Sequence, residues 1–457
     1  MKIPNRPTIR LKRALNIVRH ANGSGQLQQT AIALGCSIFA TVAGFLVQWL
    51  SARVLSPTDF GIYSIGLSLI GIGTIFALCG ADTSMLQFSS RYRADQASTA
   101  SNTLFLTLLK WCTGTSIVTI IVVYITGTTS MQMASGITLL VGACIGTITM
   151  TLLLQCRLRG IGAMTYSLLP ESVVRPGLSL ATLTLTYTIG TSLGASDLFL
   201  IILISSSVAL MLSAYWTTQH NKTTQSSKQK IETDLKIEKK SWIRNNITFL
   251  SISIGNALNT QVGVLIFGWM SLTVEAGIFG IIVRLSTLTV FVTAVINTVY
   301  SPKFVELHTK QEFKLLKAAT LEAITLSSLY AVPVFILLIG FPELVLSFFG
   351  AHFSAGAGTL QLAATGYLIQ ALSSPLFTCL VLTGSQKIMA KFQYASILIN
   401  IVATVLLAPL FGMESAAIGT ILSQILIACV VTFLAAHRIR NKGALPEQPQ
   451  KPPASPH

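Results

Sequence analysis

The chain has 457 residues, of which 52% are hydrophobic and only 10% are charged. Soluble globular domains carry about 25% charged residues, so the composition excludes that class and predicts a protein that crosses a membrane many times. The formal net charge of +16 would indicate a nucleic-acid partner in a soluble protein. In a membrane protein, basic residues instead gather in cytoplasmic loops, so the positions of the charges decide between the two explanations.

The first 28 residues are basic and contain no long apolar run. A cleavable signal peptide would need an apolar stretch directly after its basic region. The first long apolar run begins only near Thr30, and its continuation is typical of a retained helix. We therefore interpret residues 1–28 as a basic cytoplasmic arm.

Apolar stretches of membrane-spanning length follow along the rest of the chain. About 20 apolar residues are enough to cross the hydrocarbon core of a bilayer as a helix. The sequence therefore predicts an all-α polytopic membrane protein with twelve transmembrane helices, at 29–50, 60–80, 101–125, 134–156, 168–189, 197–216, 246–269, 277–299, 319–340, 359–382, 392–411 and 414–436.

One long polar segment divides these helices into two sets of six. We expect an N-terminal lobe at 29–216, a cytoplasmic linker at 217–245 and a C-terminal lobe at 246–437. The remaining residues, 438–457, are rich in proline and poor in apolar side chains, so we expect a disordered cytoplasmic tail.

The loops between the predicted helices differ in charge on alternate sides of the membrane. If the N-terminus is cytoplasmic, Arg53 is the only basic residue of the outer loops, which also contain several carboxylates. Outside the linker, the inner loops and tail contain the basic residues Arg91, Arg93, Arg157, Arg159, Lys303, Lys310, Lys314, Lys317, Lys387, Lys391, Arg438, Arg440 and Lys442. Because basic loops stay in the cytoplasm, both termini are predicted to be cytoplasmic, and nucleic acid is not needed to explain the charge.

A short internal repeat supports the division into halves. Asp59-Phe60-Gly61-Ile62-Tyr63 recurs as Glu275-Ala276-Gly277-Ile278-Phe279, 216 residues later. Since this offset covers six predicted helices, both copies have the same orientation in the membrane. Transporters built from such parallel repeats usually bind their substrate between the halves.

The first copy of the repeat follows a helix-start pattern. We expect Ser56 to be the N-cap, Pro57 the first helical residue and Asp59 the N3 carboxylate that faces the helix dipole. The second copy keeps a carboxylate as Glu275 but has Leu272 in place of the serine. Only part of the cap is therefore repeated.

The charges near the two helix starts allow two interpretations. Arg53, Asp59 and Glu275 can be helix-end residues, with Arg53 paired to Asp59 across an outer turn. They can also form a periplasmic gate. The sequence favours the first interpretation and leaves the second open.

The residue patterns of common catalytic and metal sites are missing. The chain has no Walker A pattern, and its six histidines lack the spacing of metal ligands. Its seven cysteines lie in or beside apolar runs and are expected to be small buried side chains. No predicted outer loop is longer than about 20 residues, so a periplasmic catalytic domain has no room. The sequence therefore predicts a protein that is not an enzyme and needs no metal or cofactor.

Three basic residues lie inside predicted membrane helices: Lys110, Arg175 and Arg284. A charge at such depth costs several kcal/mol unless it faces water or a partner, so these residues predict a cavity that suits an anionic substrate. Lys110 has the alternative of snorkelling to the interface, and Arg175 that of pairing with Glu171 four residues earlier. Arg284 is far from either edge and is the hardest to explain without a cavity.

The seventh predicted helix carries the polar residues Asn256, Asn259, Thr260 and Gln261. The first three share a helical face, which is therefore polar within the lipid. This face could line the cavity and bind sugar hydroxyls, or it could hold neighbouring helices together. The sequence leaves both alternatives open.

Amphipathic segments follow the second and eighth predicted helices, at 84–98 and 301–319. Both contain basic residues, and we expect both to lie along the cytoplasmic surface in contact with anionic lipid. Membrane lipids are therefore expected partners.

Two stretches resemble bacterial polysaccharide flippases, a branch of the multidrug/oligosaccharidyl-lipid/polysaccharide exporter superfamily. The first, from Ala52, reads ARVLSPTDFGIYSIGLSLIGI, and the second, residues 344–387, reads LVLSFFGAHFSAGAGTLQLAATGYLIQALSSPLFTCLVLTGSQK. The similarity runs from about residue 29 to 436, and its motifs are specific to the fold rather than to catalysis.

The resemblance implies two six-helix lobes that form a V-shaped, alternating-access transporter. It implies translocation of undecaprenyl-pyrophosphate-linked oligosaccharide, an O-antigen, capsule or exopolysaccharide repeat unit, across the bacterial inner membrane. The basic residues inside the membrane helices would suit the pyrophosphate. A polysaccharide polymerase and export machinery would be further partners.

The sequence departs from related proteins where they often carry an acidic residue in the seventh helix. This chain has TQVGVLIFG there, without a carboxylate, and Asp82 at the inner end of the second helix is the remaining candidate for cation coupling. Two other functions stay open. A multidrug/cation antiporter of the same superfamily would more naturally have an acidic cavity, and a membrane glycan ligase or polymerase would need a carboxylate or histidine cluster at the outer surface.

Overall fold

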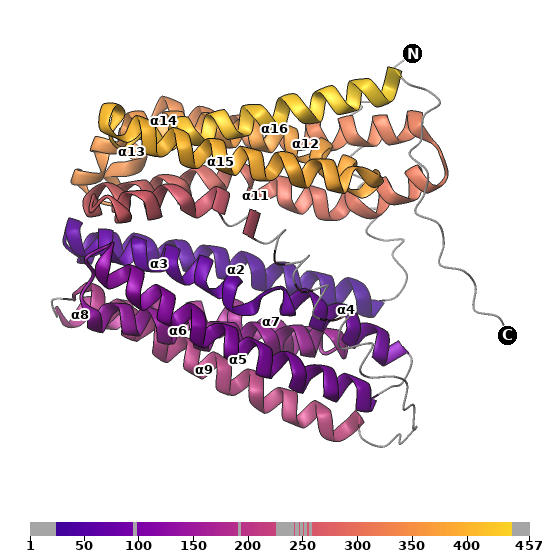
Figure 1. Ribbon diagram of the computed structural model, residues 1–457, viewed down its shortest axis with the longest axis horizontal. Helices are drawn as coiled ribbons and strands as arrows, with labels where there is room; N and C mark the ends of the chain where they lie inside the picture. Colours follow the sequence, from indigo (N-terminus) through magenta and orange to yellow (C-terminus); the bar gives the residue numbers. More distant parts are fainter. Residues whose placement is uncertain are drawn as a thin grey trace, which may run out of the picture. The chain divides into compact units, whose positions relative to one another are not determined.

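The computed structural model describes residues 24–94, 98–190, 193–224, 242, 246, 250, 254–255 and 258–440. These residues form helices joined by short turns and contain no strand (Figure 1). Helices satisfy the backbone hydrogen bonds within each segment, as a chain surrounded by lipid requires. The prediction of an all-α polytopic membrane protein is confirmed.

The helices of the first half are α2 (Ser24–Val54), α3 (Pro57–Leu78), α4 (Ala81–Ala94), α5 (Ser98–Thr129), α6 (Ser135–Gly160), α7 (Met164–Leu169), the π-helical turn η1 (Pro170–Val174), α8 (Arg175–Ile189) and α9 (Ala195–Thr224). A helical stretch at 258–269 follows. The helices of the second half are α11 (Thr273–Thr309), α12 (Phe313–Gly340), α13 (Pro342–Ser347), the 3-10 helix η2 (Ala351–Gly356), α14 (Ala357–Leu380), the π-helical turn η3 (Val381–Ser385), α15 (Gln386–Phe411) and α16 (Glu414–Arg440).

Nine stretches of the described chain are long and apolar enough to cross a membrane. One of them, 351–411, contains both α14 and α15, which correspond to two predicted spans. Two further predicted spans are helical but interrupted, because the fifth contains η1 and part of the seventh lies outside the described residues. The helices therefore agree with the twelve predicted spans.

The two amphipathic segments differ in structure. The first forms most of a separate helix, α4, although Met85 and Tyr92 on that helix are buried. The second does not form a helix of its own, because α11 continues to Thr309 and α12 begins at Phe313. That both segments lie along the cytoplasmic surface stays a prediction.

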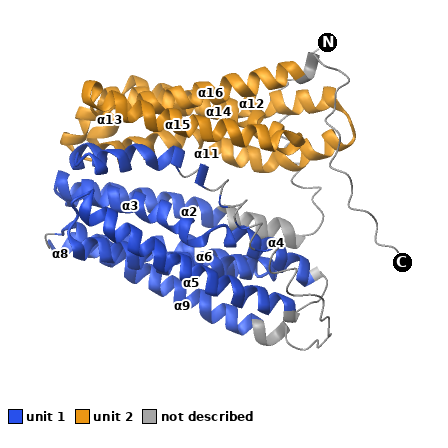
Figure 2. Cartoon of the chain, in the orientation of Figure 1, with its two compact units in different colours: residues 1–277 blue, residues 278–457 orange. Residues whose placement is uncertain are grey.

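By its internal packing the chain divides into two compact units, residues 1–277 and 278–457 (Figure 2). The boundary lies inside α11, because residues 258–277 group with unit 1. The predicted arm, linker and tail lie mostly outside the described residues, although α9 continues to Thr224, past its predicted end. The division into lobes at 29–216 and 246–437 stays a prediction.

Each unit has a helix on which several others pack. In unit 1, α6 packs against α3, α4, α5 and α9, while α8 packs against α2 and α9. In unit 2, α14 packs against α12 and α16, and α15 packs along α16. These helices hold the residues of interest in fixed relative positions within their own unit.

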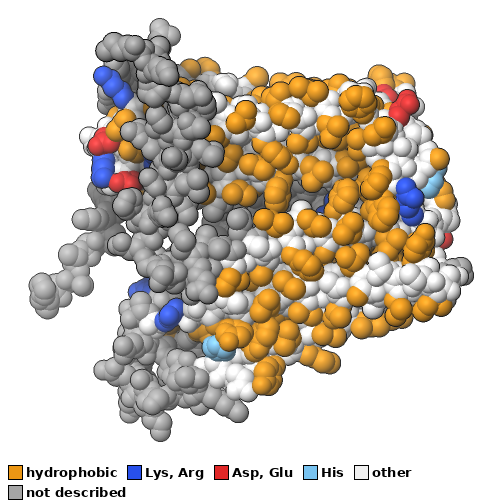
Figure 3. All heavy atoms as spheres, turned by 180° about the vertical axis from the view of Figure 1, so that it is seen from behind, with side chains coloured by type: hydrophobic (Ala, Val, Ile, Leu, Met, Phe, Trp, Pro, Cys, Tyr) orange, Lys and Arg blue, Asp and Glu red, His pale blue; other side chains and the backbone are white. Residues whose placement is uncertain are grey.

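The surface of the helices is apolar between their ends. Ile117, Leu329, Leu406 and Phe433 are all more than half exposed. On the face shown in Figure 3, hydrophobic side chains cover the middle of the helices, and most charged side chains lie toward the ends. An apolar surface of this extent requires a lipid environment.

The predicted helix start at Ser56 is confirmed. Ser56 Oγ accepts a hydrogen bond from the backbone N–H of Asp59 at 3.1 Å and donates one to Asp59 Oδ2 at 2.7 Å. Pro57 is the first residue of α3, and Thr273, 216 residues later, is the first residue of α11. The repeat seen in the sequence is therefore also a repeat of helix starts.

The two repeat copies contact each other inside unit 1. A Cβ atom on Gly61 would overlap the carbonyl oxygen of Thr273, and a Cβ atom on Gly277 would lie 3.0 Å from Gly61 Cα. Farther along α3, Ser68 Oγ donates a hydrogen bond to Gln261 Oε1 at 2.9 Å. Glycine is therefore required where the two backbones approach most closely.

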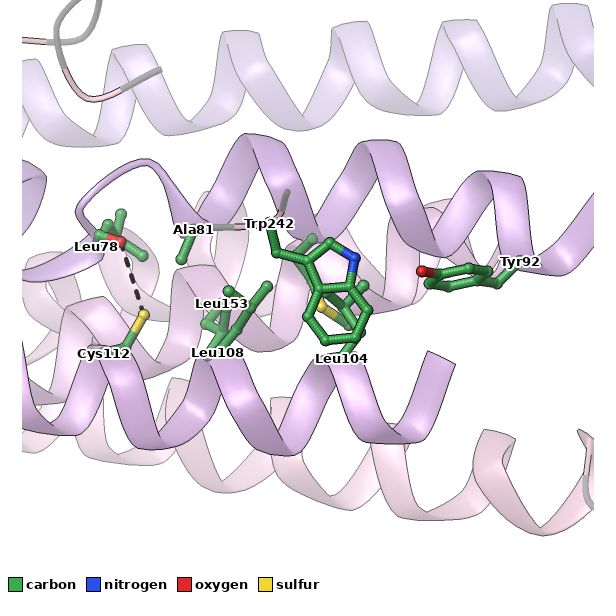
Figure 4. Packing of buried hydrophobic residues seen from close by; sticks show 9 residues of the cluster. Leu78, Ala81, Tyr92, Leu104, Leu108, Cys112, Leu153 and Trp242 are labelled. Atoms are coloured by element: carbon green, nitrogen blue, oxygen red, sulfur yellow. Dashed lines mark hydrogen bonds between the residues drawn. The ribbon is translucent and has the colours of Figure 1, made fainter. Parts of the chain in front are cut away.

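A buried aromatic residue, Trp242, joins the chain before the seventh helix to unit 1 (Figure 4). Trp242 is fully buried against side chains that include Leu78, Met85 and Leu108, from three different helices. Phe88 contacts it edge to face, with ring centroids 6.3 Å apart. Trp242 is therefore held in place by the packing of unit 1.

Gly61→Ala is expected to lower the melting temperature of the purified protein by a few degrees. The added Cβ overlaps backbone atoms, which cannot move without shifting the helix that contains them. Overpacking of this kind typically costs about 1–3 kcal/mol. Thermal unfolding in detergent measures the change. Gly71→Ala is the matched control, because its Cβ would make an ordinary contact with Gln261 at 3.7 Å and alanine favours the helix. Equal losses in both variants would contradict the assigned contact.

Trp242→Ala is expected to destabilise the protein by about 3–5 kcal/mol, the usual range for truncating a buried aromatic side chain. Trp242→Phe keeps most of the ring and should lose less. Unfolding in detergent, followed by intrinsic fluorescence, measures both. Trp269, which is 59% exposed, is the control, and a Trp269→Ala loss as large as that of Trp242→Ala would rule out the anchoring role.

Candidate functional site

Arg175 lies where the fifth membrane helix is wound as a π-helical turn. The turn η1 stands between α7 and α8, and Arg175 is the first residue of α8. Arg175 Nη2 pairs with Glu171 Oε1 at 2.9 Å. The ion pair expected as an alternative role for Arg175 is therefore confirmed.

This ion pair leaves the carboxylate only partly satisfied. Glu171 Oε2 is buried without a hydrogen-bond partner, and the side chains of Glu171 and Arg175 are 17% and 32% exposed. Helices α2, α6 and α9 pack around η1, so the pair is enclosed by unit 1. A buried charge pair gains little stability unless its remaining polar atoms are satisfied. Because π-helical turns are frequent at functional sites, the pair is a candidate for function.

Arg284 lies on the exposed face of α11 in unit 2. Its neighbours Ile281, Ile282 and Leu285 are buried, whereas the Arg284 side chain is exposed. Arg284 can therefore meet a ligand without any change in the core of its unit.

Lys110 lies on an apolar exposed face of α5. Leu106, Ile117 and Ile121 on this face are 55%, 54% and 53% exposed. A face of this composition is in contact with lipid, and a lysine on it reaches the interface with its long stem. The geometry favours snorkelling for Lys110, and its role in a cavity stays a prediction.

Arg175 and Lys110 lie on helices with different neighbours in unit 1. Helix α8, with Arg175, packs against α2 and α9, whereas α5, with Lys110, packs against α3, α4 and α6. Arg284 belongs to the other unit. Arg175 forms an ion pair with an acidic residue of its own helix, Glu171.

The polar residues of the seventh span have different environments. Gln261 accepts the hydrogen bond from Ser68 and so holds two helices together. Asn259 is half-buried, and its Oδ1 atom has no hydrogen-bond partner. Thr260 is half-buried, and Asn256 lies outside the described residues. Asn259 is thus the best remaining candidate to bind a polar ligand.

The three residues considered as a gate lie at helix ends. Arg53 is in the last turn of α2, with its guanidinium carbon 5.2 Å from the centre of the Trp49 ring. Asp59 is part of the α3 cap, and Glu275 lies in the first turn of α11. These positions fit the helix-end interpretation, and the gate stays a prediction.

Asp82 lies in the first turn of α4, directly after a tight turn at Cys79 and Gly80. Both turn residues have positive φ, at 49° and 75°. A carboxylate in a first turn faces the positive end of the helix dipole, which gives Asp82 a structural role. Among the described residues, no three His, Cys, Asp or Glu side chains gather as metal ligands. Cation coupling through Asp82 stays a prediction.

Arg157, which the sequence assigned to an inner loop, is buried in the structure. Arg157 is 2% exposed near the end of α6. Its Nη2 donates a hydrogen bond to Asn102 Oδ1 at 2.6 Å, and its guanidinium carbon lies 3.9 Å from the centre of the Phe105 ring. No local pattern connects these positions, so only the packing of α5 on α6 could reveal the contact.

Comparisons with known proteins identify both a family and a fold. The model of the polysaccharide biosynthesis protein family matches residues 27–308. A comparison with curated protein sequences found no match. Among solved structures, an inward-facing multidrug resistance MATE family transporter of the MOP superfamily has a TM-score of 0.68 and 14% identity, covering 90% of this chain and 98% of that one.

Two further solved structures have the same architecture. Lipid II flippase MurJ, in an inward closed conformation, has a TM-score of 0.61 and 12% identity, covering 89% of this chain and 87% of that one. A MOP superfamily transporter from Pyrococcus furiosus has a TM-score of 0.56 and 14% identity, covering 93% of this chain and 99% of that one.

At these identities the solved structures establish the fold alone, which this chain shares with these transporters. The family match covers more than half of the chain and includes both repeat copies and the Glu171–Arg175 pair. The chain belongs to the polysaccharide biosynthesis protein family.

Proposed function

We propose that this protein is an alternating-access flippase that translocates undecaprenyl-pyrophosphate-linked oligosaccharide across the bacterial inner membrane. The cargo is an O-antigen, capsule or exopolysaccharide repeat unit. In this proposal both termini are cytoplasmic, the protein is not an enzyme and needs no cofactor. A polysaccharide polymerase and export machinery receive the cargo.

The observation that carries this proposal is the presence of guanidinium groups inside membrane-spanning helices in a member of a polysaccharide biosynthesis family. A pyrophosphate that crosses the hydrocarbon layer needs positive partners, because an unpaired charge there costs several kcal/mol. Arginine suits this task, since its planar group forms paired hydrogen bonds with phosphate oxygens. Arg175 and Arg284 are the proposed anion-binding residues, with Lys110 as a weaker candidate.

Glu171 gives Arg175 a partner when no cargo is bound. The carboxylate is the anionic ligand that the pyrophosphate would replace, and its second oxygen lacks a partner even in the pair. Exchange of one anion for another keeps Arg175 neutralised throughout transport. The arrangement therefore avoids a bare guanidinium in the membrane.

The glycan portion of the cargo needs neutral hydrogen-bonding groups. Asn259, whose Oδ1 has no partner, is the proposed sugar-binding residue of the seventh helix, together with Thr260 and Asn256. Gln261 is already bonded to Ser68 and is proposed to hold helices together.

The second candidate is a multidrug/cation antiporter, because multidrug transporters share this fold. Members of the superfamily differ in their pockets: the Pyrococcus furiosus transporter has a binding pocket of reverse polarity, described as suggesting a different function. Organic cations would be repelled by guanidinium groups and favour an acidic cavity. The basic residues therefore support the flippase over the antiporter.

Arg284→Ala is expected to reduce polysaccharide export about tenfold or more at normal protein abundance, since a hydrogen bond to a charged group contributes about 1.5–3 kcal/mol. Surface polysaccharide is measured in cells that depend on this protein, with its membrane abundance measured in parallel. Lys314→Ala, which removes an exposed basic residue in the first turn of α12, is the control and should export normally.

Two results would count against these assignments. Unchanged polysaccharide in the Arg284→Ala variant would remove Arg284 from the site. Resistance to organic cations conferred by the wild-type protein, without any effect on polysaccharide, would instead favour the antiporter.

Glu171→Ala is expected to destabilise the protein by about 3–5 kcal/mol, because it leaves Arg175 without its partner inside unit 1. The double variant Glu171→Gln with Arg175→Gln removes both charges and should recover most of the loss in thermal unfolding. Glu306→Ala is the control: its partner Lys310 is also four residues away at 2.6 Å, but both side chains are exposed, so no measurable change is expected. A double variant that loses as much stability as Glu171→Ala, or more, would contradict the coupling between the two side chains.

A further inference from the structure

The buried face of α11 carries four polar side chains in register. Ser286, Thr289, Thr293 and Asn297 follow one another at intervals of three, four and four residues. Such spacing places all four on one face of a helix. The first three are 0%, 0% and 1% exposed, and Asn297 is half-buried. We refer to these four residues as the polar stripe.

Each residue of the polar stripe has a buried polar atom without a partner. These atoms are Ser286 Oγ, Thr289 Oγ1, Thr293 Oγ1 and Asn297 Oδ1. In the described part of unit 2, Ser327 Oγ is the only other buried side-chain polar atom of this kind. A buried polar atom left unsatisfied costs about 1–3 kcal/mol, so four in a row require a partner.

Other hydroxyl groups in unit 2 donate hydrogen bonds to backbone carbonyls of their own helix. Thr298 Oγ1 donates to the carbonyl of Ala294 at 3.0 Å, and Thr320 Oγ1 to that of Leu316 at 2.8 Å. The hydroxyls of the polar stripe do not make such bonds to their own helix. They can therefore form hydrogen bonds with a polar partner that lies beside α11.

The internal repeat provides a control for whether the fold needs a polar stripe. Counting back 216 residues gives Ile70, Gly73, Ala77 and Ala81, which are apolar or lack a side chain and are all buried. The corresponding positions of unit 1 therefore pack without polar groups. The polar stripe is a feature of the second half that the helix packing does not demand.

Helix α14 lies beside the polar stripe and runs parallel to α11. Asn297 Nδ2 donates a hydrogen bond to Ser374 Oγ at 2.8 Å, and a Cβ on Gly356 would lie 2.7 Å from Ile278 Cγ2. The two contacts join residues 77 and 78 positions apart, so a residue of α11 lies level with the residue of α14 about 77 positions later. It places the buried Tyr367 level with the middle of the polar stripe.

The spacing of the stripe identifies the ligand. Steps of three or four residues along a helix rise about 4.5–6 Å. One water molecule, with hydrogen bonds of about 2.8 Å on each side, spans such a step. A hard cation would need about six oxygens around one point, whereas these four are spread over roughly 16 Å of helix. We propose that the polar stripe binds a single file of water molecules between α11 and α14.

The surroundings confine this file to the interior of unit 2. On the Asn297 side, Phe304, Leu307, Ala323 and Cys379 form an apolar cluster, with Ile296 and Tyr300 packed against it. Arg284 is exposed rather than on the buried face. The waters are therefore held by neutral oxygen atoms and give unit 2 a hydrated interior seam. This inference does not depend on the transported substrate.

Radiolytic labelling of the purified full-length protein in ¹⁸O-water tests the proposal. Water bound beside a buried side chain generates hydroxyl radicals at that place and labels the side chain. Tyr367 is expected to be labelled several-fold faster than Tyr63, its equally buried control in unit 1; the two are 4% and 3% exposed. Labelling of Tyr367 that is no faster than that of Tyr63 would overturn the proposal.

A variant then connects the label to the polar stripe. Ser286→Ala, Thr289→Val and Thr293→Val together remove three hydroxyls with little change of shape and should lower the Tyr367 label to the Tyr63 level, with the melting temperature kept or raised. Thr293→Val alone, expected to reduce the label in part, replaces the triple variant if that one does not fold. Ser116→Ala, a buried serine of unit 1 without a partner, is the matched control and should leave the Tyr367 label unchanged. An unchanged Tyr367 label in the stripe variants would refute the site.

Discussion

Every polar group that leaves water for the interior of a membrane protein must find a partner there, and the other features of this structure depend on how that requirement is met. Backbone groups meet it by forming helices. Most hydroxyls meet it by bonding to their own helix, as Thr113 does with the carbonyl of Leu109 at 2.8 Å. Among the described residues, several buried side-chain atoms do not meet it. They include Glu171 Oε2 and the polar stripe of α11, and these are the places to which we assign function.

The charges within the membrane helices show three solutions to the same problem. Arg175 has an acidic partner one helical turn away, and Arg157 is stacked on Phe105 and bonded to Asn102. Lys110 lies on a lipid-facing surface, where a flexible stem can carry the ammonium group to the interface. Only in the first solution can an anionic ligand replace the carboxylate that pairs with the guanidinium group. For this reason we propose Arg175 as a binding residue.

The internal repeat explains how one structural plan can serve two different halves. Both copies begin a helix at the same register, and their glycines, Gly61 and Gly277, allow the backbones to touch. Beyond these shared features the halves diverge. Unit 1 has the half-buried Glu171–Arg175 pair, whereas unit 2 has the polar stripe where unit 1 has small and apolar residues. Such divergence on a common frame is expected when packing is conserved by geometry and function by individual side chains.

The sequence by itself determined the helical membrane fold, the register of the repeat and the cap at Ser56, and it offered the pairing of Arg175 with Glu171 as one of two alternatives, because each depends on residues close together in the chain. Hydrophobic length, helix-cap chemistry and a four-residue spacing are local properties. Only the tertiary structure decided that Gln261 bonds to Ser68 and that the hydroxyls of the polar stripe lack partners. Those outcomes depend on which helices are neighbours and on the direction of each side chain, and a linear pattern of residues contains neither.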